Sequence, residues 1–174
     1  GSYEASPELA LATSVRFFKE SGVMGVKLEG AHIETVKKLV TSGIPVMGHL
    51  GLTPQSMHQL GGYRVQGRTD GDVIVEAAKA LQAAGAFAIV LELVPAELAA
   101  RITAELTIPT IGIGAGVNCD AQVLVWTDLM GITKKAPKLA KAYRNLRAEM
   151  LAATGEFAAD VRSGQFPTEA QTFN

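Results

Sequence analysis

Five short apolar runs, rich in Val, Ile and Leu, recur along the chain between longer stretches whose apolar positions follow a helical period. We expect strands at residues 23–29, 44–50, 87–94, 108–116 and 122–126. Helices are expected at about residues 7–21, 32–42, 72–84, 95–106 and 137–154, where caps, prolines and glycines mark most of their ends. Residues 155–174 are expected to form a C-terminal tail with a short helix and an irregular end.

This alternation of strands and helices predicts an α/β fold. Strands that are apolar throughout are typical of a parallel sheet with both faces covered. A doubly wound sheet and a (β/α)8 TIM-type barrel both fit the order, and both place chemistry at the carboxyl ends of the strands. A barrel typically needs about 250 residues, whereas this chain has 174. We therefore expect a single domain, residues 1–174, that supplies about five strands of such a barrel.

Composition and charge narrow the class of protein. The chain is 48% hydrophobic, and its 16 basic and 17 acidic residues are scattered, so no footprint for nucleic acid or an anionic membrane is visible. Cys119 is the single cysteine, which excludes a disulfide framework within the chain. Glu92 interrupts the most apolar segment, so no run reaches the length of a membrane helix. A cytoplasmic protein is expected.

Two charges close the first predicted strand, in the sequence VMGVKLEG. Lys27 and Glu29 are two residues apart, so in a strand their side chains point to the same face. They could be a solvated pair that contributes at most about 1 kcal/mol. Alternatively, Lys27 holds an anionic substrate group and Glu29 serves a metal ion or its waters.

His49 and Glu92 stand at the ends of the next two predicted strands. His49 could be a hydrogen-bonded structural residue or part of a site. Glu92 lies in the strand expected to be most buried, where a carboxylate must be paired, hydrogen-bonded or protonated. A structural alternative pairs Glu92 with Arg101 or another basic group, whereas the functional interpretation makes it a proton acceptor.

Two glycine-rich segments are candidate binding elements. The glycines of GIGAG, residues 112–116, lead into a predicted strand rather than a helix, so we reject a dinucleotide-binding motif. They could let the backbone approach a ligand or simply turn the chain, and we expect the turn. The loop LGGYRVQGR, residues 60–68, could cover the site or simply be solvated.

The segments VKLEG, GHLGLTPQS, LGGYRVQGR, LELVP and IPTIGIGAGVNCDAQVLVW strongly resemble the ketopantoate hydroxymethyltransferase family, in the family's order and over essentially the whole chain. The resemblance implies a (β/α)8 barrel, assembly as a homodecamer, and a role in pantothenate biosynthesis. It also implies Mg2+-dependent transfer of a hydroxymethyl group from 5,10-methylenetetrahydrofolate to 3-methyl-2-oxobutanoate (2-oxoisovalerate).

The resemblance assigns roles to four residues. Lys27 matches the lysine that contacts the oxoacid, Glu29 the acidic residue of the metal site, and His49 the active-site histidine. Glu92 matches the proposed proton acceptor. Lys27 and Glu29 would then share one task, which is to hold a metal-bound oxoacid.

The family's first barrel strands have no match in this sequence. In the family those strands carry two aspartates that bind the metal and a serine that binds the substrate carboxylate. The chain is therefore expected to be the C-terminal portion of the enzyme, active only together with those strands. One alternative is an inactive fragment or assembly subunit that keeps the fold. Another is a related oxoacid lyase, which would cleave a C–C bond without folate.

Overall fold

The computed structural model describes residues 2–173, which form two compact units. The first unit is Gly1–Val123 and the second is Leu124–Asn174. We predicted one domain over residues 1–174. Whether the two units together form that domain stays a prediction.

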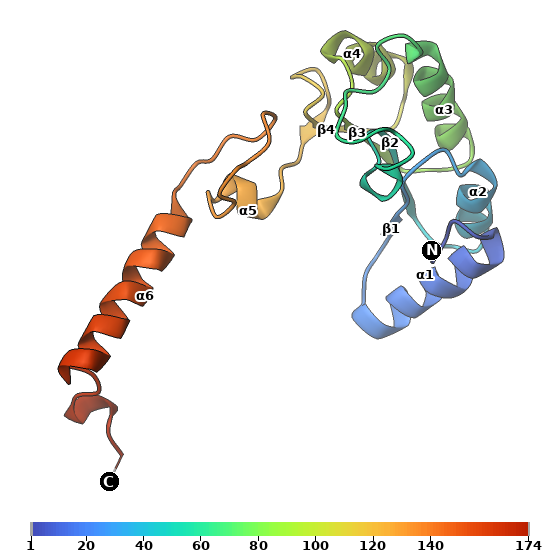
Figure 1. The fold of residues 1–174 in the computed structure, drawn as a ribbon. Coiled ribbons are helices and arrows are strands. Elements are labelled where there is room, and N and C mark those ends of the chain that lie inside the picture. The colour runs from blue at the N-terminus through green and yellow to red at the C-terminus, as the bar shows by residue number, and fades with distance from the viewer. Residues whose placement is uncertain (1, 174) are drawn as a thin grey trace. The chain divides into compact units, whose positions relative to one another are not determined.

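The first unit is an α/β fold in which strands alternate with helices, as predicted (Figure 1). Its elements are α1 (Pro7–Ser21), β1 (Val26–Lys27), α2 (Ile33–Thr41), β2 (Val46–Gly51), the 3₁₀ turn η1 (Pro54–Ser56), α3 (Gly71–Ala83), β3 (Ala88–Glu92), α4 (Ala96–Glu105), β4 (Thr110–Ile113) and β5 (Ala121–Gln122).

The five strands form one parallel sheet in the order β1-β2-β3-β4-β5. The order follows the sequence without the reversal that marks a doubly wound sheet, and a consecutive order is what a barrel requires. The sheet is open over residues 2–173, so these residues do not form a closed barrel.

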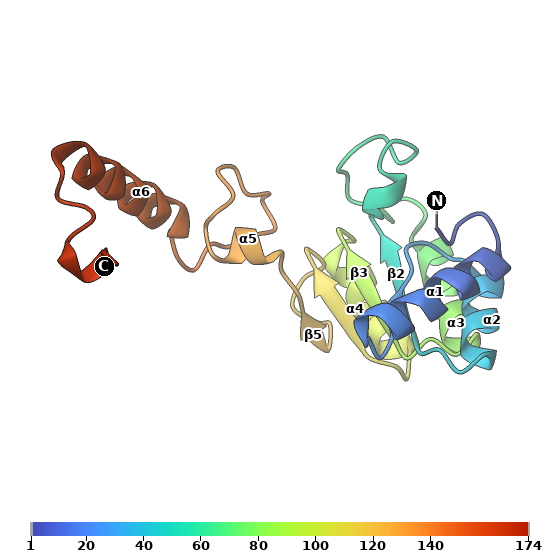
Figure 2. The same ribbon diagram turned by 90° about the horizontal axis from the view of Figure 1, so that it is seen from below.

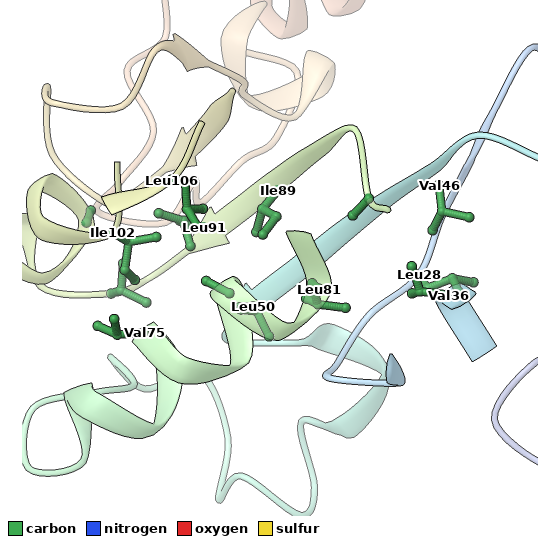
Figure 3. Packing of buried hydrophobic residues seen from close by; sticks show 14 of the residues in the cluster. Leu28, Val36, Val46, Leu50, Val75, Leu81, Ile89, Leu91, Ile102 and Leu106 are labelled. Carbon is green, nitrogen blue, oxygen red and sulfur yellow. The ribbon is translucent and has the colours of Figure 1, made fainter. Parts of the chain in front are cut away.

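The two faces of the sheet differ. Along β2 and β3 the buried residues Val46, Leu50, Ile89 and Leu91 point toward the helices, because alternate side chains of a strand share a face. They pack against helix residues including Val36, Val75, Leu81 and Ile102 (Figure 3). The other face carries partly exposed positions of β2, β3 and β4, namely Met47, Val90, Glu92 and Ile111. The prediction of a sheet covered on both faces is therefore met on one face only in the described residues.

Neighbouring helices pack in sequence along the covered face, α1 on α2, α2 on α3 and α3 on α4 (Figure 2). The start of α1 is capped as predicted, since the Ser6 hydroxyl accepts a hydrogen bond from the Leu9 N–H at 3.1 Å. Its end is also as predicted, with Gly22 in the left-handed conformation at φ 69°.

The second unit contains α5 (Trp126–Leu129), α6 (Leu146–Ser163) and the 3₁₀ turn η2 (Glu169–Gln171). The strand predicted at residues 122–126 is wrong beyond Gln122, and Trp126 instead begins α5. The helix predicted at residues 137–154 is displaced, because the side chain of Asn145 caps α6 by accepting from Ala148 N–H at 3.3 Å. The boundary expected at residue 155 is also wrong, since α6 runs through Gly155 to its left-handed cap at Gly164.

Candidate functional site

The parallel register brings the predicted site residues to one edge of the sheet. His49 pairs with Val90, and Gly51 pairs with Glu92, so the ends of β2 and β3 lie side by side. Strand β1 is short, but its ladder continues through hydrogen bonds from Leu28 N–H to Met47 and from Gly30 N–H to His49. All four predicted residues therefore gather at the carboxyl ends of three strands. Lys27, Glu29, His49 and Glu92 are called the strand-end site below.

Lys27 contacts two members of this site. Its Nζ lies 3.0 Å from Glu29 Oε1 and 3.4 Å from His49 Nδ1. The first contact confirms that Lys27 and Glu29 point the same way. An ammonium group has three N–H donors, so these partners leave one donor for an anionic ligand. The Lys27 side chain is 39% exposed, whereas that of Glu29 is 8% exposed. The ammonium is thus the part of the pair that a ligand can reach.

His49 lies between Lys27 and Glu92 and is 4% exposed. Because the Lys27 ammonium can only donate, its contact with Nδ1 places the proton of a neutral ring on Nε2. Nε2 lies 3.2 Å from Glu92 Oε2, but the two groups are not aligned for a hydrogen bond. This buried nitrogen consequently has no hydrogen-bond partner within the described part of the chain. A buried donor of this kind is suited to an oxygen atom of a ligand.

Glu92 is close to His49, and its side chain is 13% exposed. The pairing with Arg101 is wrong, because Arg101 contacts Asp72 at 2.6 Å and Glu105 at 2.8 Å. The Glu92 carboxylate is therefore not neutralised by that arginine. The basic group that lies beside Glu92 is His49.

The backbone around Glu92 is tightly held. Its carbonyl oxygen accepts from Leu52 N–H at 2.8 Å, and the next residue, Leu93, has a positive φ of 47°. Gly51 has a φ of 91°, and a Cβ there would clash with the Glu92 carbonyl oxygen and with Val94. Glycine is needed at this point because the ends of β2 and β3 approach so closely.

Two residues beside Glu29 were missed by the sequence analysis. The N–H of Gln55, in η1, donates to Glu29 Oε2 at 2.9 Å, and the Tyr3 hydroxyl accepts from Glu29 N–H at 3.0 Å. Gln55 lies inside the quoted motif GHLGLTPQS and could have been singled out there. No pattern in the sequence points to Tyr3.

The Mg2+ ion that the resemblance implies would need several oxygen ligands at the strand-end site. Both carboxylate oxygens of Glu29 already accept hydrogen bonds, one from Lys27 and one from Gln55. In residues 2–173 no three His, Cys, Asp or Glu side chains come together as a metal site. The described residues alone therefore do not fit a bound Mg2+ ion, which needs several oxygen ligands.

The glycine-rich segments take different places. Gly114 and Gly116 have positive φ values and turn the chain after β4, and a Cβ on Gly116 would crowd Ala96 at the start of α4. The interpretation of GIGAG as a turn is confirmed. In the loop of residues 60–68, Gln66 N–H donates to Leu93 O at 2.9 Å, so the loop is attached directly after Glu92.

A parallel α/β fold with charged side chains at the carboxyl ends of consecutive strands is typical of an α/β enzyme. A family model described as ketopantoate hydroxymethyltransferase matches residues 1–169, and the chain belongs to that family. Among relatives named 3-methyl-2-oxobutanoate hydroxymethyltransferase, it is 57% identical to that of Saccharopolyspora erythraea and 58% identical to that of Acidothermus cellulolyticus. Both alignments cover 99% of this chain, but only 60% and 65% of the respective relatives.

A solved structure shares the fold. The crystal structure of the Amycolatopsis orientalis BexX/CysO complex matches with a TM-score of 0.53 at 15% identity, covering 96% of this chain and 68% of that one.

In the described residues, none of the helices combines the length and apolar character needed to cross a membrane.

Proposed function

We propose that this chain carries the proton-transfer and substrate-binding side of a 3-methyl-2-oxobutanoate hydroxymethyltransferase, within a complete (β/α)8 barrel. The observation that supports this most is the strand-end site, where a lysine, a histidine and two carboxylates meet at the ends of three consecutive strands. The consecutive strand order supports the barrel.

Lys27 and His49 have the contacts needed to bind an oxoacid. Lys27 keeps one N–H donor beyond its contacts with Glu29 and His49, and its charge would offset that of the substrate carboxylate. The Nε2–H of His49 is the second donor that lacks a partner in the described residues, and it would hold a substrate oxygen. The substrate would then replace solvent at both groups.

Glu92 is the group proposed to accept the proton. Its carboxylate would remove the hydrogen from C3 of 3-methyl-2-oxobutanoate, which leaves the electron pair as an enolate. The C3 carbon of the enolate would then form a bond to the methylene carbon of 5,10-methylenetetrahydrofolate, and both bonds from that carbon to the folate nitrogens would break. Water would supply the hydroxyl group of ketopantoate, and tetrahydrofolate would leave with its two nitrogens protonated.

The need for Mg2+ belongs to the proposal. Since both Glu29 oxygens already accept hydrogen bonds, Glu29 is better placed to orient a water molecule of the ion than to complete a site by itself. The homodecamer is likewise proposed from the resemblance, as is the cytoplasmic location.

Exchange of the C3 hydrogen of 3-methyl-2-oxobutanoate for deuterium, with Mg2+ present, tests this function in the natural full-length protein. Glu92→Gln is expected to slow the exchange about 10²- to 10⁴-fold. Glu97→Gln, an exposed carboxylate in the first turn of α4, is the matched control and should exchange like wild type.

Each outcome has a clear meaning. Exchange that persists in Glu92→Gln would remove Glu92 as the base. A wild-type protein that shows no exchange would favour the inactive assembly subunit, and C–C cleavage without folate would favour a lyase.

A further inference from the structure

The hydroxyl of Tyr3 joins the two segments that hold Glu29. It accepts the Glu29 backbone N–H at 3.0 Å and lies 2.5 Å from Gln55 Oε1, to which it donates its own hydrogen. The backbone N–H of Gln55 in turn donates to Glu29 Oε2 at 2.9 Å. Tyr3, Glu29 and Gln55 thus form a closed ring of hydrogen bonds that connects the chain before α1, the end of β1 and the η1 turn.

The Tyr3 ring is held firmly enough to act as an anchor. It is 8% exposed, and it packs edge-on against His32 with ring centroids 5.7 Å apart and planes at 89°. Burial is the largest cause that raises the pKa of the Tyr3 phenol above its usual value of 10. The phenol therefore keeps its hydrogen at neutral pH and can donate and accept at the same time.

Glu29 has little freedom once the ring of hydrogen bonds among Tyr3, Glu29 and Gln55 is formed. Its N–H, Oε1 and Oε2 are each bonded, to Tyr3, Lys27 and Gln55 respectively. Of these bonds, the one to Lys27 reaches the ligand-binding side of the site, and the other two come from the ring. The ring of hydrogen bonds thus fixes the position of the carboxylate that Lys27 contacts.

We propose that Tyr3 is a positioning residue of the strand-end site, whose hydroxyl fixes the Glu29 carboxylate beside Lys27. It acts through Glu29 and Gln55 and need not touch the substrate. Its effect on turnover rests on the function proposed above, whereas its effect on the Glu29 backbone does not.

Amide hydrogen exchange in the natural full-length protein tests the structural half of this proposal. In Tyr3→Phe, the Glu29 N–H loses its acceptor and is expected to exchange at least about tenfold faster, with the global unfolding midpoint changed by only a few degrees. The control is Tyr143→Phe, which removes a hydroxyl from an exposed ring with no hydrogen bond to it among the described residues. Unchanged protection of the Glu29 N–H in Tyr3→Phe would overturn the proposal.

A double-mutant cycle tests the functional half. Tyr3→Phe is expected to lower kcat/KM about tenfold, and Glu29→Gln to lower it further. Because Tyr3 acts through Glu29, the double variant should be no worse than Glu29→Gln alone. Additive losses would mean that Tyr3 acts elsewhere and would overturn its positioning role. If wild type showed no turnover, the proposed function would fail, while the exchange experiment would still decide whether Tyr3 holds Glu29.

Discussion

Two clusters of charged side chains in the first unit have similar distances but different surroundings. The strand-end site has contacts of 3.0 to 3.4 Å, and its Glu29, His49 and Glu92 side chains are largely buried. On the outer surface of α3 and α4, Lys79 contacts Glu105 at 2.6 Å, and Arg101 contacts Asp72 at 2.6 Å and Glu105 at 2.8 Å. The surface cluster has the shorter contacts, yet nothing about it indicates a binding site.

The difference lies in which donors are left over. In the surface cluster each cation faces carboxylates and water, so a ligand would gain little by displacing them. In the strand-end site a buried histidine nitrogen has no hydrogen-bond partner in the described residues, and a lysine keeps one donor. Short distances therefore identify ion pairs, whereas a buried group without a hydrogen-bond partner makes the strand-end site the candidate for ligand binding.

The largest effect is expected where the backbone supports the strand-end site. Gly51→Ala would combine a positive φ with a clash against the Glu92 carbonyl oxygen, and is expected to lower the free energy of unfolding by at least about 3 kcal/mol. Urea unfolding of the natural full-length protein measures this loss.

Gly43→Ala is the control for this change. Gly43 also has a positive φ, of 83°, but a Cβ there would meet nothing within 4 Å, so the loss should be only about 1 kcal/mol. Equal losses at the two glycines would show that the close approach of β2 and β3 contributes little beyond backbone strain.

The sequence predicted much of the fold because its signals are local. Apolar runs mark β2, β3 and β4, and Ser6 and Gly22 mark the ends of α1. The helix predicted from residue 137 failed because composition favoured a helix there, while the cap that starts α6 is a single side chain, Asn145.

The candidate site also has features that a local sequence pattern predicts and features that it does not. The shared face of Lys27 and Glu29 follows from a period of two, which the sequence contains. The approach of His49 to Glu92 depends on the register of β2 against β3, which no local pattern encodes. Tyr3 was missed because it meets Glu29 across 26 positions of the chain and lies outside every predicted element.

The same substitution in both clusters would sharpen the comparison. Lys27→Met removes a charged donor from the strand-end site and is expected to lower kcat/KM about 10- to 100-fold. Lys79→Met makes the same change in the surface cluster and should leave kcat/KM unchanged. Steady-state kinetics with 3-methyl-2-oxobutanoate as the varied substrate measures both. A loss of similar size in Lys79→Met would show that the surface cluster also supports activity.

The smallest expected effect is the contribution of Glu105, in the surface cluster, to stability as the pH is lowered. Lys79, the largest cause, and Arg101 lower the pKa of Glu105 below its usual value of 4.5 in the folded protein. As the pH falls, Glu105 therefore takes up a proton in the unfolded chain before it does so in the folded protein. The stabilisation of the folded protein by the Glu105 ion pairs is complete above about pH 4.5, and it is lost as the pH falls through the lower pKa of the folded protein. Glu105→Gln should lower the unfolding midpoint by no more than a few degrees at neutral pH, and by less in high salt.

The control is Glu97→Gln, because Glu97 is exposed and has no ion pair within the part of the chain that the structure describes. Thermal unfolding of both variants and wild type across the acid range provides the measurement. Once Glu105 is protonated in wild type, Glu105→Gln and wild type should differ no more than Glu97→Gln and wild type do. A difference that grows toward acid would mean that Glu105 is stabilised in its protonated form, contrary to its pairing with two cations. It would also weaken the contrast with the strand-end site, since exposed pairs would then depend on their surroundings as strongly as buried ones do.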